Sequence, residues 1–251
     1  MSSTLAPSRA LSGYWRAARA PRYSLLFALP LLVLYETLAA LLPRSETGGV
    51  RNGADVMLKS LFVFLAGTHG PLLFGVVLIG VCVWLVRRDV AARGAGLDGW
   101  MFGAMFAESV ALALAFGVVV GVITARLLGA VGVLALGPMD RLDVWTQLMV
   151  SLGAGLYEEL LFRVILVSAL AVVARRLLGW REWVAGAVAT VLGAVIFSAS
   201  HYVGPYGDTL RVRSFVFRMV GGTFFSAIYL LRGFGIVAWT HALYDVLLLF
   251  G

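Results

Sequence analysis

The sequence predicts an all-α membrane protein, a polytopic bundle of about seven transmembrane helices. Three observations lead to this fold class. Of the 251 residues, 61% are hydrophobic and only 13% are charged, and the mean hydropathy is +0.94, which is more apolar surface than one soluble core can bury. Long apolar runs recur between short charged or Gly/Pro-containing joints. These runs lack the alternation of apolar and polar residues that marks the strands of a membrane barrel.

The apolar runs set the expected spans, because a bilayer core about 30 Å thick requires roughly 20 apolar residues per helix. We predict seven spans, at residues 24–42, 72–86, 101–128, 144–171, 183–202, 215–231 and 234–250. A shorter run at 55–66 or at 129–136 would add an eighth span. Apolar runs of about 10–14 residues are, however, more often interfacial or re-entrant.

The chain has no polar linker and no repeat of fixed period, so we predict one membrane domain. Its parts are a basic segment at 1–22, N-terminal helices at 23–143 and C-terminal helices at 144–251. The arginines are scattered between apolar runs, which argues against a nucleic-acid partner despite the net charge of +7. An Ala- and Arg-rich chain with the single lysine Lys59 is typical of a bacterial protein, so we expect the inner (plasma) membrane.

Basic residues on alternate joints predict the orientation of the chain, because Arg and Lys are enriched in cytoplasmic loops. One side of the predicted topology carries the larger set, namely Arg9, Arg16, Arg19, Arg22, Arg87, Arg88, Arg93, Arg175, Arg176, Arg181 and Arg232. We therefore predict a cytoplasmic N-terminus.

Ionisable residues inside the spans need a reason, since each costs about 2.5–3.5 kcal/mol at the centre of a membrane helix. They are Glu36, Glu108, Glu158, Glu159, Arg163, His201, Arg218, His241 and Asp245. For Glu36 and Glu108 three alternatives stay open: a place along a substrate path, pairing with Arg218, or another structural pairing between helices. The six residues other than Glu36, Glu108 and Arg218 belong to three short patterns in the C-terminal half of the chain. We expect these patterns near the middle of the bilayer.

The first pattern is Glu158-Glu159-Leu-Leu-Phe-Arg163, inside the fourth predicted span. On a helix Glu159 and Arg163 are i,i+4 neighbours and can pair. Glu158 is rotated by about 100° from Glu159 and is left available. A carboxylate in an apolar site can act as a general base or acid, but a structural Glu–Arg pair between helices would produce the same pattern.

The second and third patterns each place a histidine in a predicted span. Phe197 precedes His201 by four residues, so the aromatic ring can wall the pocket of the imidazole. His241 precedes Asp245 by four residues, which suits two metal ligands or a carboxylate that orients the imidazole. For each histidine the alternative is a hydrogen-bonded packing residue.

Together these residues allow two chemistries. Two imidazoles and a carboxylate, such as His201, His241 and Asp245, could bind zinc or another divalent metal with a position left for water. In a metal-free mechanism Glu158 would activate the water, and the histidines would stabilise the developing oxyanion.

The ordered patterns Glu-Glu-x-x-x-Arg, Phe-x-x-x-His and His-x-x-x-Asp resemble those of the CPBP (CAAX protease and bacteriocin-processing, Abi) family of intramembrane proteases, over roughly 144–250. The resemblance implies that Glu158 activates the attacking water, that His201 and His241 bind or polarise the reacting centre, and that Asp245 is the fourth catalytic position. Glu159 and Arg163 would support the site. In the prenyl-protein endoprotease branch the position of Asp245 is Asn.

The expected function is therefore an intramembrane endopeptidase that cleaves a membrane-associated or lipid-anchored protein. The expected partners are such a substrate, as a membrane protein or lipidated peptide, and the lipid bilayer. Two alternatives stay open: a non-catalytic scaffold or immunity protein of the same family, and an ion-coupled transporter that uses the buried charges as a relay. No inverted repeat supports the transporter.

Overall fold

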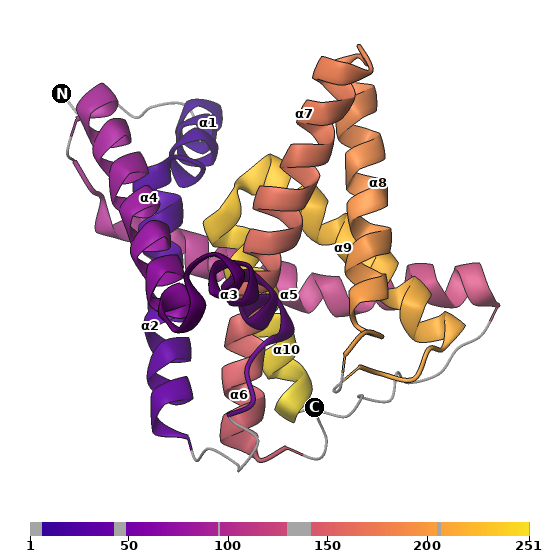
Figure 1. Ribbon diagram of the computed structural model, residues 1–251. Helices are drawn as coiled ribbons and strands as arrows, with labels where there is room; N and C mark the ends of the chain where they lie inside the picture. The colour runs from indigo at the N-terminus through magenta and orange to yellow at the C-terminus, as the bar shows by residue number, and fades with distance from the viewer. Residues whose placement is uncertain (1–6, 43–48, 95, 130–141, 205–206, 251) are drawn as a thin grey trace.

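A computed structural model describes residues 7–42, 49–94, 96–129, 142–204 and 207–250. Every regular element in these ranges is helical, which confirms the predicted all-α fold. The elements are α1 (Pro7–Ala18), α2 (Pro21–Leu41), α3 (Gly53–Ala66), the 3₁₀ turn η1 (Gly67–His69), α4 (Gly70–Arg93), α5 (Gly99–Leu128), α6 (Val144–Gly153), the π-helix η3 (Ala154–Val167), α7 (Ser168–Leu177), α8 (Glu182–Ser200), α9 (Val212–Arg232) and α10 (Phe234–Phe250) (Figure 1).

Five helical segments within the described ranges are long and apolar enough to cross a membrane: Pro21–Leu41, Gly53–Arg93, Gly99–Leu128, Glu182–Ser200 and Val212–Arg232. At most 39% of the apolar stretch of any of them is buried inside the protein. The outward-facing side chains include large apolar ones such as Phe64 and Leu72. Lipid is the solvent that such a surface requires, so the chain is an integral membrane protein.

The predicted number of seven spans is not confirmed. The run at 144–171 lies in the helix formed by α6, η3 and α7, which carries three ionisable side chains in its middle. The run at 234–250 is α10, whose 17 residues fall short of the roughly 20 that a bilayer core requires. The run at 55–66 lies within α3, and most of 129–136 lies outside the described residues.

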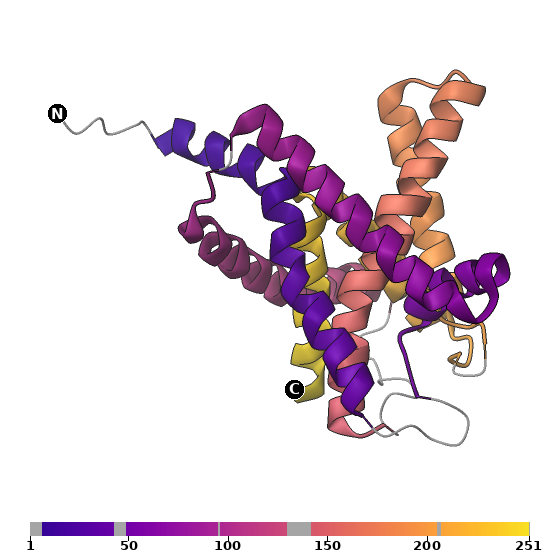
Figure 2. The same ribbon diagram turned by 60° about the vertical axis from the view of Figure 1, so that its left-hand side comes forward.

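The chain turns sharply between α3 and α4. The 14 residues of α3 give a helix only about 21 Å long. Gly67 ends it with a φ of +56°, a conformation that favours glycine. A Cβ atom on Gly70 would overlap the backbone of Val63, so the absence of a side chain lets α4 begin directly against α3. Figure 2 shows α3 turned aside at one end of α4, which brings Asn52, before α3, into the interior.

The C-terminal helix α10 is the centre of the packing. It contacts α2, α5, α6, η3 and α9, and α5 passes behind it in Figure 1. Ile236 and Val237 have no exposed surface. A Cβ atom on Gly155 of η3 would lie 2.6 Å from the Cβ of Ala242 and would also overlap the carbonyl oxygen of Ala238. The two backbones therefore touch, as small residues allow in membrane helices.

Candidate active site

The structure places all seven predicted site residues in one connected group. Three helices contribute to it, because η3 packs against both α8 and α10 (Figure 1). The π-helix η3 carries the two glutamates and the arginine, and single π-helical turns occur often at functional sites. The group consists of Glu158, Glu159 and Arg163 on η3, Phe197 on α8 with His201 directly after it, and His241 and Asp245 on α10.

One half of the group is fully enclosed. Glu159 is 0% exposed and lies between two partners. Its Oε2 is 3.2 Å from Nε of Arg163, and its Oε1 is 2.7 Å from Nδ1 of His241. Because a carboxylate only accepts, Nδ1 of His241 carries the proton. The Nε2 of this histidine then faces Oδ2 of Asp245 at 3.7 Å.

Aromatic rings enclose this buried half. The guanidinium of Arg163 lies 4.3 Å from the ring centroid of Phe197 and 5.5 Å from that of Phe225, which is favourable for a cation over a ring face. The imidazole of His241 stacks on Phe225 with 4.2 Å between centroids. Arg163 also donates to the carbonyl oxygen of Gly222. These contacts hold the ion pair away from lipid and water.

The other half of the group is accessible. The side chain of Glu158 is 13% exposed, that of His201 is 26% exposed and that of Asp245 is 23% exposed. Oε2 of Glu158 lies 4.0 Å from Nε2 of His201. Nδ1 of His201 is 2.8 Å from the carbonyl oxygen of Phe197, so Nδ1 donates and Nε2 keeps its lone pair. Of the two adjacent glutamates, only Glu158 is free to meet a reactant.

Asn52 belongs to the site but is absent from the sequence-based prediction. It is 3% exposed, and its Nδ2 donates to Oε1 of Glu158 at 2.9 Å. Its Oδ1 accepts from the backbone N–H of Ala54 at 2.9 Å. An Asn before an apolar helix does signal an N-cap. Asn52 and Glu158 are 106 positions apart in the chain, so no local sequence pattern reveals their contact.

The other two glutamates of the predicted spans form structural ion pairs, one of the predicted alternatives, but Arg218 is not their partner. Glu36 pairs with Arg51 and Lys59 instead of Arg218. Glu108 pairs with Arg232, with 2.5 Å between Oε1 and Nε. The partners of Glu36 lie just before α3 and within it, and Arg232 is the last residue of α9, which packs against α5.

Arg218 itself forms an ion pair with Asp208, in the segment that joins α8 to α9. Its guanidinium also lies 5.4 Å from the ring centroid of Tyr202. Arg218 therefore lies on the same side of the molecule as His201, whose carbonyl oxygen accepts from the N–H of Asp208 at 2.9 Å.

The metal set His201, His241 and Asp245 does not converge in this conformation. Among the described residues, no three His, Cys, Asp or Glu side chains lie close enough together to hold one ion. Nδ1 of His241 is taken by Glu159, and Nε2 of His201 faces Glu158 rather than Asp245. The residues in these positions do not fit a three-ligand site.

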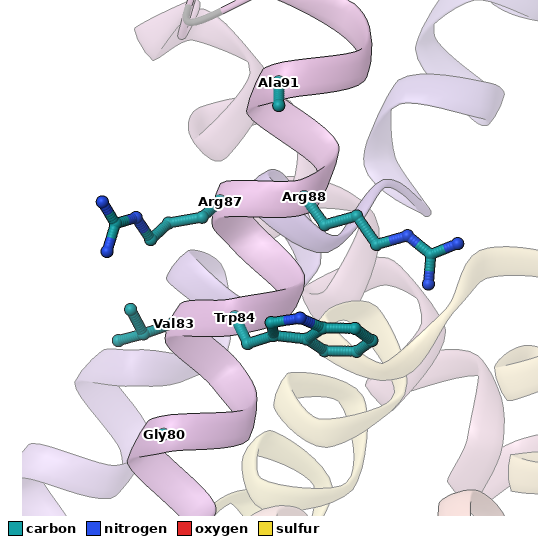
Figure 3. A pocket seen from close by; sticks show the side chains of 6 residues that line it. All are labelled: Gly80, Val83, Trp84, Arg87, Arg88 and Ala91. Atoms are coloured by element: carbon teal, nitrogen blue, oxygen red, sulfur yellow. The ribbon is translucent and has the colours of Figure 1, made fainter.

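A surface hollow lies on α4, away from these residues. It is open and shallow, and a single helix lines it, as Figure 3 shows. Its lining residues are Gly80, Val83, Trp84, Arg87, Arg88 and Ala91. No residue of the candidate active site contributes to it.

Comparison with known proteins points to the same part of the chain. Residues 140–247 match a family model described as type II CAAX prenyl endopeptidase Rce1-like. This range contains all three motifs and excludes the helices before α6. No curated protein and no solved structure matched the chain. Residues 140–247 are therefore similar to the Rce1-like type II CAAX prenyl endopeptidases.

Proposed function

We propose that this protein hydrolyses a peptide bond in a membrane-associated or lipid-anchored polypeptide, with water activated by Glu158. The observation that carries the proposal is the division between the two adjacent glutamates. Glu159 is locked between Arg163 and His241, whereas Glu158 is partly exposed and turns Oε2 toward His201.

The geometry suits a water molecule between Glu158 and His201. Their facing atoms are 4.0 Å apart, which is too long for a direct hydrogen bond and short enough for a bridging water. Both atoms are acceptors, because Nδ1 of His201 holds the ring proton. One water can donate to Oε2 and to Nε2, which leaves its lone pairs directed at a substrate carbonyl.

Hydrolysis then follows the general acid–base pattern. The water oxygen attacks the carbonyl carbon while Glu158 takes one proton. When the tetrahedral intermediate collapses, the C–N bond breaks and Glu158 returns that proton to the leaving amine. His241 is flanked by Glu159 and Asp245, so it can hold a proton on Nε2 and donate it to the oxyanion.

The substrate class rests on the family and on the apolar surroundings. The matching family model is that of a CAAX prenyl endopeptidase, and the site lies among helices whose outer faces are apolar. A substrate held at the membrane by a lipid or an apolar segment reaches such a site without leaving the bilayer. The position of Asp245, which is Asn in the prenyl-protein branch, is a candidate determinant of substrate choice.

The test compares peptide termini in the membrane proteome of cells that carry the wild-type protein, Glu158→Ala or Glu182→Ala at equal abundance. Glu182 is a surface glutamate with an 83% exposed side chain, so it is the matched control. We expect defined fragments to disappear with Glu158→Ala and to persist with Glu182→Ala. Unchanged termini with Glu158→Ala would exclude the protease function and favour the scaffold alternative.

We propose no step through a metal, because the three candidate ligands do not converge. Treatment of the purified protein with a zinc chelator should leave its cleavage rate unchanged. Loss of activity that added zinc restores would instead establish a metal-dependent mechanism.

A further inference from the structure

We infer that Asn52 is a positioning residue that selects which oxygen of Glu158 faces the reactants. This inference rests on the proposed role of Glu158. Asn52 lies outside residues 140–247, the range that matches the protease family. The inference therefore assigns a part of the site to the N-terminal half of the chain.

Three hydrogen bonds fix the orientation of Asn52. Its backbone N–H donates to the hydroxyl of Tyr35 at 3.2 Å. Its Oδ1 accepts from the N–H of Ala54 at 2.9 Å, as the N-cap of α3. Because Oδ1 is committed to a donor, the Nδ2 amine must be the group that points at Glu158. The amide cannot flip without placing two donors against each other.

A charge cluster centred on the buried Asp55 packs behind Asn52 and holds this arrangement. The Tyr35 hydroxyl donates to Asp55 at 2.8 Å, and Asp55 pairs with both Arg51 and Lys59, at 2.9 and 2.7 Å. Tyr157, the residue before Glu158, donates to Glu36 at 2.9 Å. The cluster thus connects α2, the start of α3 and η3. Asn52 can shift only if this network of satisfied charges also shifts.

The hydrogen bond from Asn52 determines which of the two carboxylate oxygens of Glu158 faces His201. A carboxylate has two oxygens, and Asn52 occupies Oε1, so Oε2 is the oxygen left toward His201. Without the Asn52 donor, the carboxylate is free to rotate about its terminal torsion, and the water site between Glu158 and His201 is no longer defined. Misplacement of a reacting group lowers the chemical step more than it lowers binding.

The experiment separates this role from helix capping. Asn52→Ser keeps a side-chain oxygen suited to the N-cap but cannot reach Glu158 with a donor, whereas Asn52→Ala loses both functions. Asp143→Ala is the control for cap loss alone, because Asp143 caps α6 through the N–H groups of Trp145 and Thr146. Each full-length variant is purified and assayed with a fluorogenic peptide that spans the scissile bond found by the comparison of termini.

We expect Asn52→Ser and Asn52→Ala to lower kcat by roughly 10- to 100-fold, the usual effect of losing a hydrogen bond to a charged group, with KM changed less than about threefold. Asn52→Ser should unfold at the wild-type temperature, and Asp143→Ala should unfold earlier with wild-type kcat. Wild-type kcat in Asn52→Ser, or a loss that only follows the unfolding temperature, would overturn the inference. Wild-type activity of Glu158→Ala would instead overturn the proposed function itself.

Discussion

At the scale of single residues, the site depends on two neighbouring glutamates with opposite tasks. Glu159 neutralises Arg163 and orients His241 inside a closed, aromatic-lined space. Glu158, one residue earlier, stays accessible and is held by Asn52. The i,i+4 rule is sufficient to predict the Glu159–Arg163 pair from the sequence. It cannot predict His241 or Asn52 as partners, because those contacts join residues far apart in the chain.

Loss of the buried arginine should destabilise the protein strongly. Arg163 is 1% exposed, and Arg163→Ala leaves Glu159 as a buried charge with one partner fewer, which typically costs about 3–5 kcal/mol. Arg175→Ala is the matched control, because Arg175 pairs with Glu182 at the surface, where an ion pair contributes about 1 kcal/mol or less. Thermal unfolding in detergent measures both variants. A wild-type unfolding temperature for Arg163→Ala would show that the ion pair is not structural.

At the scale of helices, contact between η3 and α10 sets the distance between the motifs. Gly155 lies one turn before the glutamates and touches the backbone of α10 near Ala238 and Ala242. The hydropathy of the sequence predicts both helices. It does not predict that η3 is a π-helix, since that conformation depends on packing against neighbouring helices.

Gly155→Ala should force η3 and α10 apart. The added methyl group would meet backbone atoms, which cannot rotate away, so we expect a cost of about 1–3 kcal/mol and a lower cleavage rate. Gly186→Ala on α8 is the control, because a Cβ atom there meets nothing within 4 Å. It should be neutral or slightly stabilising, since Ala favours helix over Gly by up to about 1 kcal/mol. Unfolding temperature and cleavage rate are measured together. Equal behaviour of the two variants would contradict the close contact.

Sequence patterns predict the spans well where a run is long and uncharged, as for α2, α5, α8 and α9. The short run at 55–66 is the helix α3, but hydropathy does not predict the turn at Gly67 and Gly70 that packs this helix against α4. That turn positions α3 so that Asn52, which precedes it, lies in the interior. Local hydropathy contains no information about it, and this is why the N-terminal contribution to the site is missing from the prediction.

At the scale of the whole molecule, the start of the chain contacts two of the joints that are predicted to be cytoplasmic. The Nη1 of Arg232, the last residue of α9, donates to the carbonyl oxygen of Trp15 at 3.3 Å. The N–H of Asp98, before α5, donates to the hydroxyl of Tyr23 at 2.9 Å. The start of the chain and two predicted cytoplasmic joints therefore meet. His201 follows the last residue of α8, so it lies at the end of that helix far from the arginine-rich joint before Glu182. The sequence alone predicts a place near the middle of the bilayer.

If the N-terminus is cytoplasmic, the segments between helices that lie outside the cell membrane can be identified with a membrane-impermeant reagent. In a Cys82→Ser background, Thr209→Cys, between α8 and α9, should react with a membrane-impermeant maleimide in intact spheroplasts. Glu182→Cys, at the start of α8, should react only after lysis, because the arginine-rich joint beside it is retained in the cytoplasm. Both native residues are exposed, so access to solvent does not distinguish them. The reverse labelling pattern would invert the orientation and place the His201 end in the cytoplasm.

The most direct test of the account is the turnover of purified Glu158→Gln. Gln keeps the shape of the side chain and an oxygen that can accept from Asn52, but it cannot take a proton from water. We predict a fall in kcat of about 10²-fold or more, the typical contribution of a general base, with little change in KM. A Glu158→Gln protein that cleaves at the wild-type rate would contradict the account, because the proton would then go to another group.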